Sequence, residues 1–248
     1  MFAIYKKELR SFFINPIGYV FVGAFLGIAA LLCCYTTIMS SSYDTSEYFM
    51  LMIFVLGVLI PLLTMRLFAE ERKLRTEQLL LTAPVTITGM VLGKFLAALT
   101  TFAASLLISC INFIPIYITA AAERDGQSYD FMHIGPVTGE LLGNLFSLLL
   151  IGAAFIALGT FISALTENQL AAAVITISVI LLMLGISLLN SFIDLYWLRT
   201  VLSWISVYSR FGNFQNGLFD FAAILYYASI SFIFVFLTIR VYEKRRWN

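Results

Sequence analysis

Six long apolar stretches constrain the fold of this chain more than any other feature of its sequence. A helix needs about 20 apolar residues to cross roughly 30 Å of hydrocarbon, whereas a strand of a membrane barrel needs only about 9–11. The stretches are continuously apolar and have the helical length. We therefore expect an all-α, polytopic membrane protein with a single transmembrane domain over residues 1–248. The six spans lie near Ile17–Met39, Phe49–Leu67, Val91–Ile118, Leu141–Leu165, Leu170–Ile193 and Phe221–Ile239.

The composition indicates that a lipid bilayer is the solvent of this chain. Hydrophobic residues make up 61% of it and charged residues 12%, against about 45–50% and 25% in soluble domains. The net charge of +1 gives no overall field that would attract nucleic acid. The single His133 and the cysteines Cys33, Cys34 and Cys110 show no metal-ligand spacing. We expect the bilayer as a partner, no metal site and no nucleic acid.

Lys and Arg are distributed unequally between the two sides of the expected bundle. Cytoplasmic loops of membrane proteins carry an excess of these residues, so the asymmetry predicts cytoplasmic N- and C-termini. Three of the fifteen, Arg124, Arg199 and Arg210, fall on the outer side. The other twelve fall on the side of the termini: Lys6, Lys7, Arg10, Arg66, Arg72, Lys73, Arg75, Lys94, Arg240, Lys244, Arg245 and Arg246.

The spans show no means of drawing on an ion gradient or on ATP. Ionisable groups lie at their ends, as Arg66 and Arg240 do, whereas ion-coupled carriers place such groups within the membrane. Gly89–Phe95 resembles a P-loop only faintly, because its glycines are too close together and Phe95 replaces the Mg²⁺-binding Ser or Thr. We interpret this stretch as a small-residue helix face from which Lys94 extends to the interface. The energy for transport would come from another polypeptide on the cytoplasmic side.

The first residues predict a helix that lies in the membrane interface. Within Met1–Phe12, apolar side chains recur at helical spacing, and Lys6, Lys7 and Arg10 form the opposite face. The expected apolar face consists of Phe2, Tyr5, Leu9 and Phe12.

A second charged segment, Ala69–Thr88, predicts a helix that ends at Pro84, with charges in its first half and leucines in its second. It is either a juxtamembrane helix with a solvated face or a helix, Glu70–Thr82, that inserts into a cleft of a partner ATPase. In the second case ten residues would form the coupling site: Glu70, Glu71, Arg72, Lys73, Thr76, Leu79, Leu80, Leu81, Thr82 and Pro84.

Small and polar residues within the spans indicate helix packing and kinks. Gly23 and Gly27 form a small-residue face, which we expect to pack within the chain rather than at a dimer seam. Pro115 can kink the third span, and the amide of Asn112 needs a partner in hydrocarbon. Asn112 and Pro115 either line a substrate path or serve packing alone.

The connection 194–220 predicts an amphipathic helix with aromatic residues suited to the membrane–water interface. It either anchors the sixth span or forms a lid over the outer end of a path. The candidate lid residues are Trp204, Tyr208, Phe211 and Phe214.

Three regions, in order along the chain, resemble the type-two ABC export permease family, and within it the gliding-motility-type permeases. The most specific match runs from Glu70–Lys73 to the Leu-Leu-Leu-Thr-x-Pro-Val sequence that ends at Val85. Two positions depart from the family pattern, because many members have Gly at Arg75 and Glu at Gln78. The matching regions are Tyr5–Phe13 with Asn15–Val20; Phe68–Lys73 and Thr76–Val85 with Leu92–Phe95; and Phe211–Phe214 and Gly217–Asp220 with Tyr242–Trp247.

The resemblance implies an N-terminal elbow helix, a cytoplasmic coupling helix and outer re-entrant or lid helices before the last span. Two permease chains, either two copies or one copy with a sister permease, would work with two ABC ATPase subunits as an exporter in a bacterial plasma membrane. ATP and Mg²⁺ would bind to the ATPase, so this chain would hold no cofactor and would not be an enzyme. The substrate would be a lipid, peptide or glycan. The alternatives are a non-transporting scaffold or sensor for a cytoplasmic partner and, less favoured, an ion-coupled carrier.

Overall fold

The computed structural model describes residues 1–40, 43–78, 85–125, 135–189, 197, 206–215 and 220–247. Over these ranges the chain is helical without strands, and six helices are long and apolar enough to cross a membrane. The all-α, polytopic prediction is therefore confirmed. The helices are α1 (Phe2–Ile14), α2 (Pro16–Cys33), α3 (Ser46–Thr64), α4 (Arg66–Lys73), α6 (Ile87–Ser109), α7 (Ile114–Asp125), α8 (Thr138–Leu165), α9 (Gln169–Leu189), α11 (Phe211–Gln215) and α12 (Phe221–Trp247), with short π or 3₁₀ turns at Cys34–Ile38, Cys110–Phe113 and Tyr208–Arg210.

Helix α8 forms the centre of the bundle and packs against α3, α4, α6, α9, α11 and α12. Its apolar window is 67% buried, compared with 22% for the last span, so α8 is enclosed by protein. Two glycines allow its neighbours to approach. A Cβ at Gly152 would overlap the ring of Phe102 on α6, and one at Gly159 would overlap Thr64 at the end of α3.

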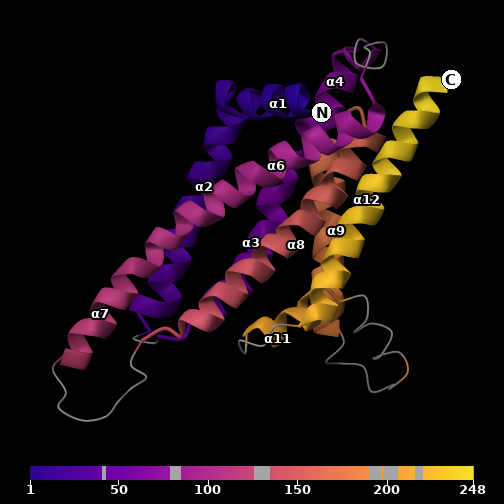
Figure 1. Ribbon diagram of the computed structural model, residues 1–248. Helices are drawn as coiled ribbons and strands as arrows, with labels where there is room; N and C mark the ends of the chain where they lie inside the picture. Colours follow the sequence, from indigo (N-terminus) through magenta and orange to yellow (C-terminus); the bar gives the residue numbers. More distant parts are fainter. Residues whose placement is uncertain are drawn as a thin grey trace.

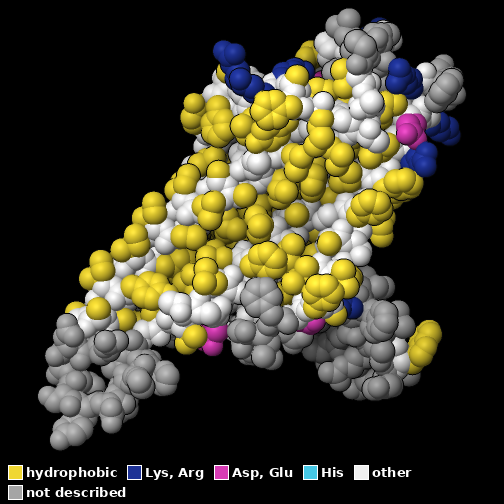
Figure 2. Space-filling view, viewed as in Figure 1, with side chains coloured by type: hydrophobic (Ala, Val, Ile, Leu, Met, Phe, Trp, Pro, Cys, Tyr) yellow, Lys and Arg dark blue, Asp and Glu magenta, His cyan; other side chains and the backbone are white. Residues whose placement is uncertain are grey.

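The two ends of the bundle differ in charge. Both termini, α1 and α4 lie at one end, and α11 lies at the other (Figure 1). We call these the basic end and the α11 end. Figure 2 shows hydrophobic side chains along the flank of the bundle and most of the visible Lys and Arg gathered at the basic end. This is the arrangement expected of a membrane-spanning bundle whose polar ends lie in water.

Helix α1 lies across the basic end instead of running along the spans, as an interfacial helix would (Figure 1). Of its predicted apolar face, Phe12 is buried in the bundle and Phe2 is 76% exposed, and Ile4 and Glu8 are buried beside Phe12. The predicted small-residue face on α6 explains why this side of α1 is turned toward the bundle. A Cβ at Gly93 would lie 3.3 Å from atoms of α1, so glycine allows α1 to pack closely there.

Two other sequence features have clear outcomes. A Cβ added at Gly23 or Gly27 would meet nothing within 4 Å, so this face does not pack against the described part of the chain. The expected packing within the chain is therefore wrong. A 3₁₀ turn, Cys110–Phe113, interrupts the third span just before Pro115, because the proline ring excludes a regular α-helical bond to the preceding turn.

Candidate functional site

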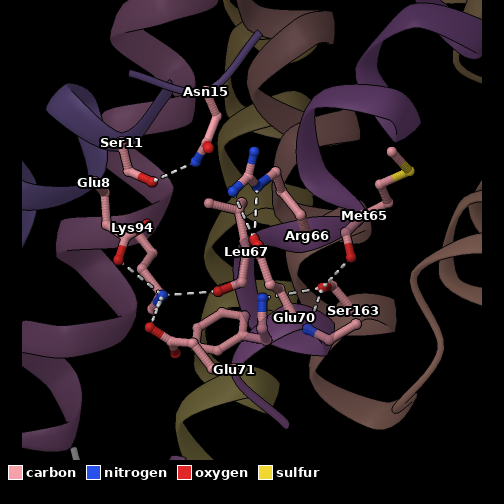
Figure 3. A network of polar contacts seen from close by, with 12 residues as sticks. Glu8, Ser11, Asn15, Met65, Arg66, Leu67, Glu70, Glu71, Lys94 and Ser163 are labelled. Atoms are coloured by element: carbon pink, nitrogen blue, oxygen red, sulfur yellow. Dashed lines mark hydrogen bonds and ion pairs between the residues drawn. The ribbon is translucent and has the colours of Figure 1, made fainter. Parts of the chain in front are cut away.

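Helix α4 extends the second span beyond the bundle, and a serine of α8 secures its first turn. The first N–H groups of a helix lack partners within it. Ser163 Oγ accepts hydrogen bonds from the N–H groups of Phe68 at 3.1 Å and Ala69 at 3.2 Å, and donates one to the carbonyl of Met65 at 3.0 Å (Figure 3). One buried hydroxyl therefore fixes the start of α4 on the end of α8.

A buried lysine joins α4 to α1 and α6. Lys94 Nζ lies 3.0 Å from Glu8 Oε1 on α1, 2.9 Å from Glu71 Oε1 on α4 and 2.7 Å from the carbonyl of Leu67 (Figure 3). Its side chain is 1% exposed, so the expectation that Lys94 reaches the interface is wrong. An ammonium has three N–H donors, and the three oxygens satisfy all of them. A buried charge is tolerated when it is paired and hydrogen-bonded in this way.

Lys7 balances the charge of this cluster from its exposed side. Its Nζ lies 3.5 Å from both Glu8 Oε1 and Glu71 Oε1, and its side chain is 60% exposed. Two cations therefore face two carboxylates. The ring of Phe68 lies 5.1 Å from Lys94 Nζ and adds a cation–π contact. We call these four charged residues, Lys7, Glu8, Glu71 and Lys94, the Lys94 cluster.

Three other charged residues of α4, Arg66, Glu70 and Arg72, also bind within the chain. Arg66 pairs with Glu70 at 2.7 Å, beside a cavity of about 180 Å³ that extends to the Lys94 cluster. Arg72 donates to the carbonyl of Leu165 at 2.8 Å and pairs with Glu167 at 2.9 Å, so it caps the last turn of α8. Helix α4 is thus braced along most of its length.

The helix then ends earlier than its sequence predicts. Arg75 has φ of +57°, a left-handed conformation, and the chain turns there. The N–H and the hydroxyl of Thr76 both bond to the carbonyl of Glu71, at 2.9 and 3.3 Å, and close the turn. The expected single helix Glu70–Thr82 is therefore wrong. Lys73 is exposed, and Leu74 is 64% exposed.

The comparison with protein families decides what this chain is. Residues 35–242 match the model of the ABC-2 family transporter proteins, which covers five of the six spans and the α4 region. The chain belongs to the ABC-2 transporter family. It is accordingly a membrane permease subunit of an ABC transporter. A comparison with curated proteins gave no match.

The permease structure places the predicted coupling residues in two groups. Glu70, Glu71, Arg72 and Thr76 bond within the chain as described, whereas Lys73 points outward. The remaining five, Leu79, Leu80, Leu81, Thr82 and Pro84, lie outside the described residues.

The described path and lid residues lie at the α11 end of the permease, in two separate places. The carbonyl of Asn112 accepts a weak bond from Cys33 Sγ of α2 at 3.4 Å, and Pro115 is exposed nearby in the sequence. Phe211 and Phe214 are 0% and 1% exposed and belong to the short helix that packs on α8. Tyr208 is half-buried, and Trp204 lies outside the described residues.

Sequence reasoning missed the residues that hold α4 in place, Glu8, Lys94 and Ser163. A signal for Glu8 was present, because it falls at helical spacing between Ile4 and Phe12, the two apolar residues that are buried with it. Ser163 gives no such signal, since a serine in an apolar span usually bonds to its own helix.

Proposed function

We propose that a separate ABC ATPase docks at the basic end of this permease, on Lys73, Leu74 and the segment that follows to Pro84, and drives the export or membrane extraction of a lipid, peptide or glycan. The observation that carries the proposal is the braced helix α4. A partner that pushes on the chain past Lys73 acts on a base fixed by the Lys94 cluster and Ser163. Its movement would therefore reach α1, α6 and α8 together. ATP and Mg²⁺ would bind to the partner.

The basic end would face the cytoplasm, as the distribution of Lys and Arg predicts. A second permease chain, identical or a sister, would complete the transporter. The open face at Gly23 and Gly27 supports such pairing, because glycines in a membrane helix allow close approach of another helix. A bacterial plasma membrane and the gliding-motility-type subgroup fit the same proposal.

Co-purification tests the docking. The permease, tagged and reconstituted in nanodiscs, would be mixed with the ATPase encoded beside it, and ATPase capture and ATP hydrolysis would be measured. The variants Lys73→Glu and Leu74→Asp change exposed side chains. They should weaken capture about tenfold or more if these residues lie at the centre of the interface. Glu71 is a poor probe, because its loss would disrupt the Lys94 cluster.

The matched control is Lys244→Glu, a charge reversal at another exposed lysine of the basic end. It should leave capture unchanged. If no ATPase is captured by the wild-type permease, or if Lys73→Glu and Leu74→Asp bind as the wild type does, the docking proposal is wrong. Capture without any effect of the permease on ATP hydrolysis would favour the scaffold alternative.

A further inference from the structure

The last turns of α12 reach back to the α4 region. The apolar part of this helix ends near Ile239, and the helix continues to Trp247. Tyr242 in this extension is 1% exposed, and its ring centroid lies 4.9 Å from that of Phe68 on α4 (Figure 1 shows the end of α12 near α4). A segment that only left the membrane would be exposed on all sides. This one packs against the helix that precedes the proposed docking segment.

Arg245 in the same extension binds two other parts of the chain at once. Its Nη2 donates to the carbonyl of Ala164, in the last turn of α8, at 2.7 Å, and its Nη1 donates to Glu77 Oε1 at 3.2 Å. The guanidinium also lies 5.2 Å from the ring centre of Tyr242, which holds it in place. The Arg245 and Glu77 side chains are only 24% and 14% exposed, so water competes weakly for this pair.

The position of Glu77 gives this contact its importance. Glu77 lies beyond the turn at Arg75, so the hydrogen bonds of α4 do not fix it. Arg245 ties it to α8 and α12 instead. A planar guanidinium suits this role, because it presents several donors in fixed directions and can bond to a carbonyl and a carboxylate together.

We propose that Arg245 is a positioning residue that latches the ATPase-docking segment to α8 and α12. The inference rests on the proposed function and deepens it. The latch holds the segment past Arg75 in the conformation that the partner binds, and it delivers the partner's movement to α8 and α12, which are remote from that segment in sequence. Without the latch, only a fraction of molecules would present the segment correctly, and the apparent affinity would fall by that fraction.

Two measurements on the variants Arg245→Gln, Glu77→Gln and the double variant test whether this latch exists. The first is hydrogen exchange of the amides of residues 74–78 in the reconstituted permease alone. The second is the affinity of the co-expressed ATPase for the same sample. We expect each single variant to speed exchange and weaken ATPase binding about tenfold, the size of one charge-assisted contact. The double variant should be no worse than the more affected single variant, because both remove one contact.

Arg240→Gln is the matched control. Arg240 lies on the same helix, is 62% exposed and pairs only with Glu243 among the contacts described for its side chain, besides a stacking contact with Phe236. It should change neither measurement. If Arg245→Gln does not fold, Glu77→Gln still removes the ion pair of the latch while leaving the bond to Ala164. Wild-type exchange in both single variants, or fully additive effects, would overturn the proposal. Failure of the wild-type permease to bind an ATPase would instead overturn the proposed function, and the exchange data would still decide whether the latch exists.

Discussion

The two ends of this permease differ in whether their buried polar groups have bonding partners. At the basic end, the buried or half-buried charges of α4, α6 and α12 have partners, and Ser163 makes three hydrogen bonds. At the α11 end, buried polar atoms of four residues have no hydrogen-bond partner in the described part of the chain. They are Asn112 Nδ2, both amide atoms of Asn144, Ser147 Oγ and Arg210 Nε.

This difference separates a rigid end from one that can rearrange. Moving the basic end breaks paired charges, and separating a buried pair is expensive. Moving the α11 end separates no ion pair among the described residues, although it would break the hydrogen bond from the Tyr227 hydroxyl to the carbonyl of Val207, and unpartnered polar groups that become exposed gain water as a partner. The short helix α11 lies against this part of α8. A Cβ added at Gly143 would lie 3.5 Å from the carbonyl oxygen of Phe214. We therefore expect input at the basic end to be answered by movement at the α11 end.

The largest expected effect comes from breaking the Lys94 cluster. Lys94→Met keeps the aliphatic stem but leaves Glu8 and Glu71 buried without their main cation, which should lower the free energy of unfolding by about 3–5 kcal/mol. Unfolding by SDS in mixed micelles, followed by circular dichroism, measures this. Adding Glu8→Gln to Lys94→Met should restore part of the loss, because one fewer carboxylate is left unpaired.

Lys244→Met serves as the control for this variant. Lys244 is exposed, so its removal should change the free energy of unfolding by no more than about 0.5 kcal/mol. Wild-type stability of Lys94→Met would mean that the basic end is not held by its charges, and the contrast between the two ends would lose its main support.

Two serines of α8 give an internal comparison of the ends at the same residue type and burial. Ser163 and Ser147 are both 0% exposed. Ser163→Ala removes the hydrogen bonds of Ser163 Oγ to Phe68, Ala69 and Met65 and should lower the free energy of unfolding by about 1–3 kcal/mol. Ser147→Ala removes an unpartnered hydroxyl and should leave stability unchanged or raise it by up to about 1 kcal/mol. The same SDS titration measures both, and equal losses would refute the contrast.

The sequence predicts the spans well because each is determined by its own residues. A helix that must satisfy all its backbone bonds in hydrocarbon is recognised from a long apolar run. All six predicted starts fall within four residues of the observed ones, for example Ile17 against Pro16 and Leu170 against Gln169. The last span shows the limit of this reasoning, since α12 continues past its apolar part as far as Trp247.

The contacts of the candidate site depend on residues far apart in the sequence, which hydropathy does not pair. Glu8 and Lys94 are separated by 86 positions, and Phe68 and Ser163 by 95. A lone lysine near the end of an apolar span therefore resembles one that extends to the interface. The structure shows that packing of α1 on Gly93 places Glu8 beside it instead.

The turn at Arg75 is the one place in the described chain where a non-glycine residue has a positive φ, and it gives the smallest expected effect. A left-handed conformation costs a residue with a Cβ about 1–2 kcal/mol, and the greater freedom of unfolded glycine offsets about 0.5–1 kcal/mol of any gain. Arg75→Gly should therefore raise the free energy of unfolding by roughly 0.5–1 kcal/mol. Arg75→Ala keeps the Cβ and should give no gain, which separates backbone strain from loss of the charge.

A gain in both variants would point to charge repulsion among the basic residues, and a gain in neither would mean that the turn carries no strain. A gain in the glycine variant alone would show that the otherwise well-bonded basic end is strained where the docking segment begins.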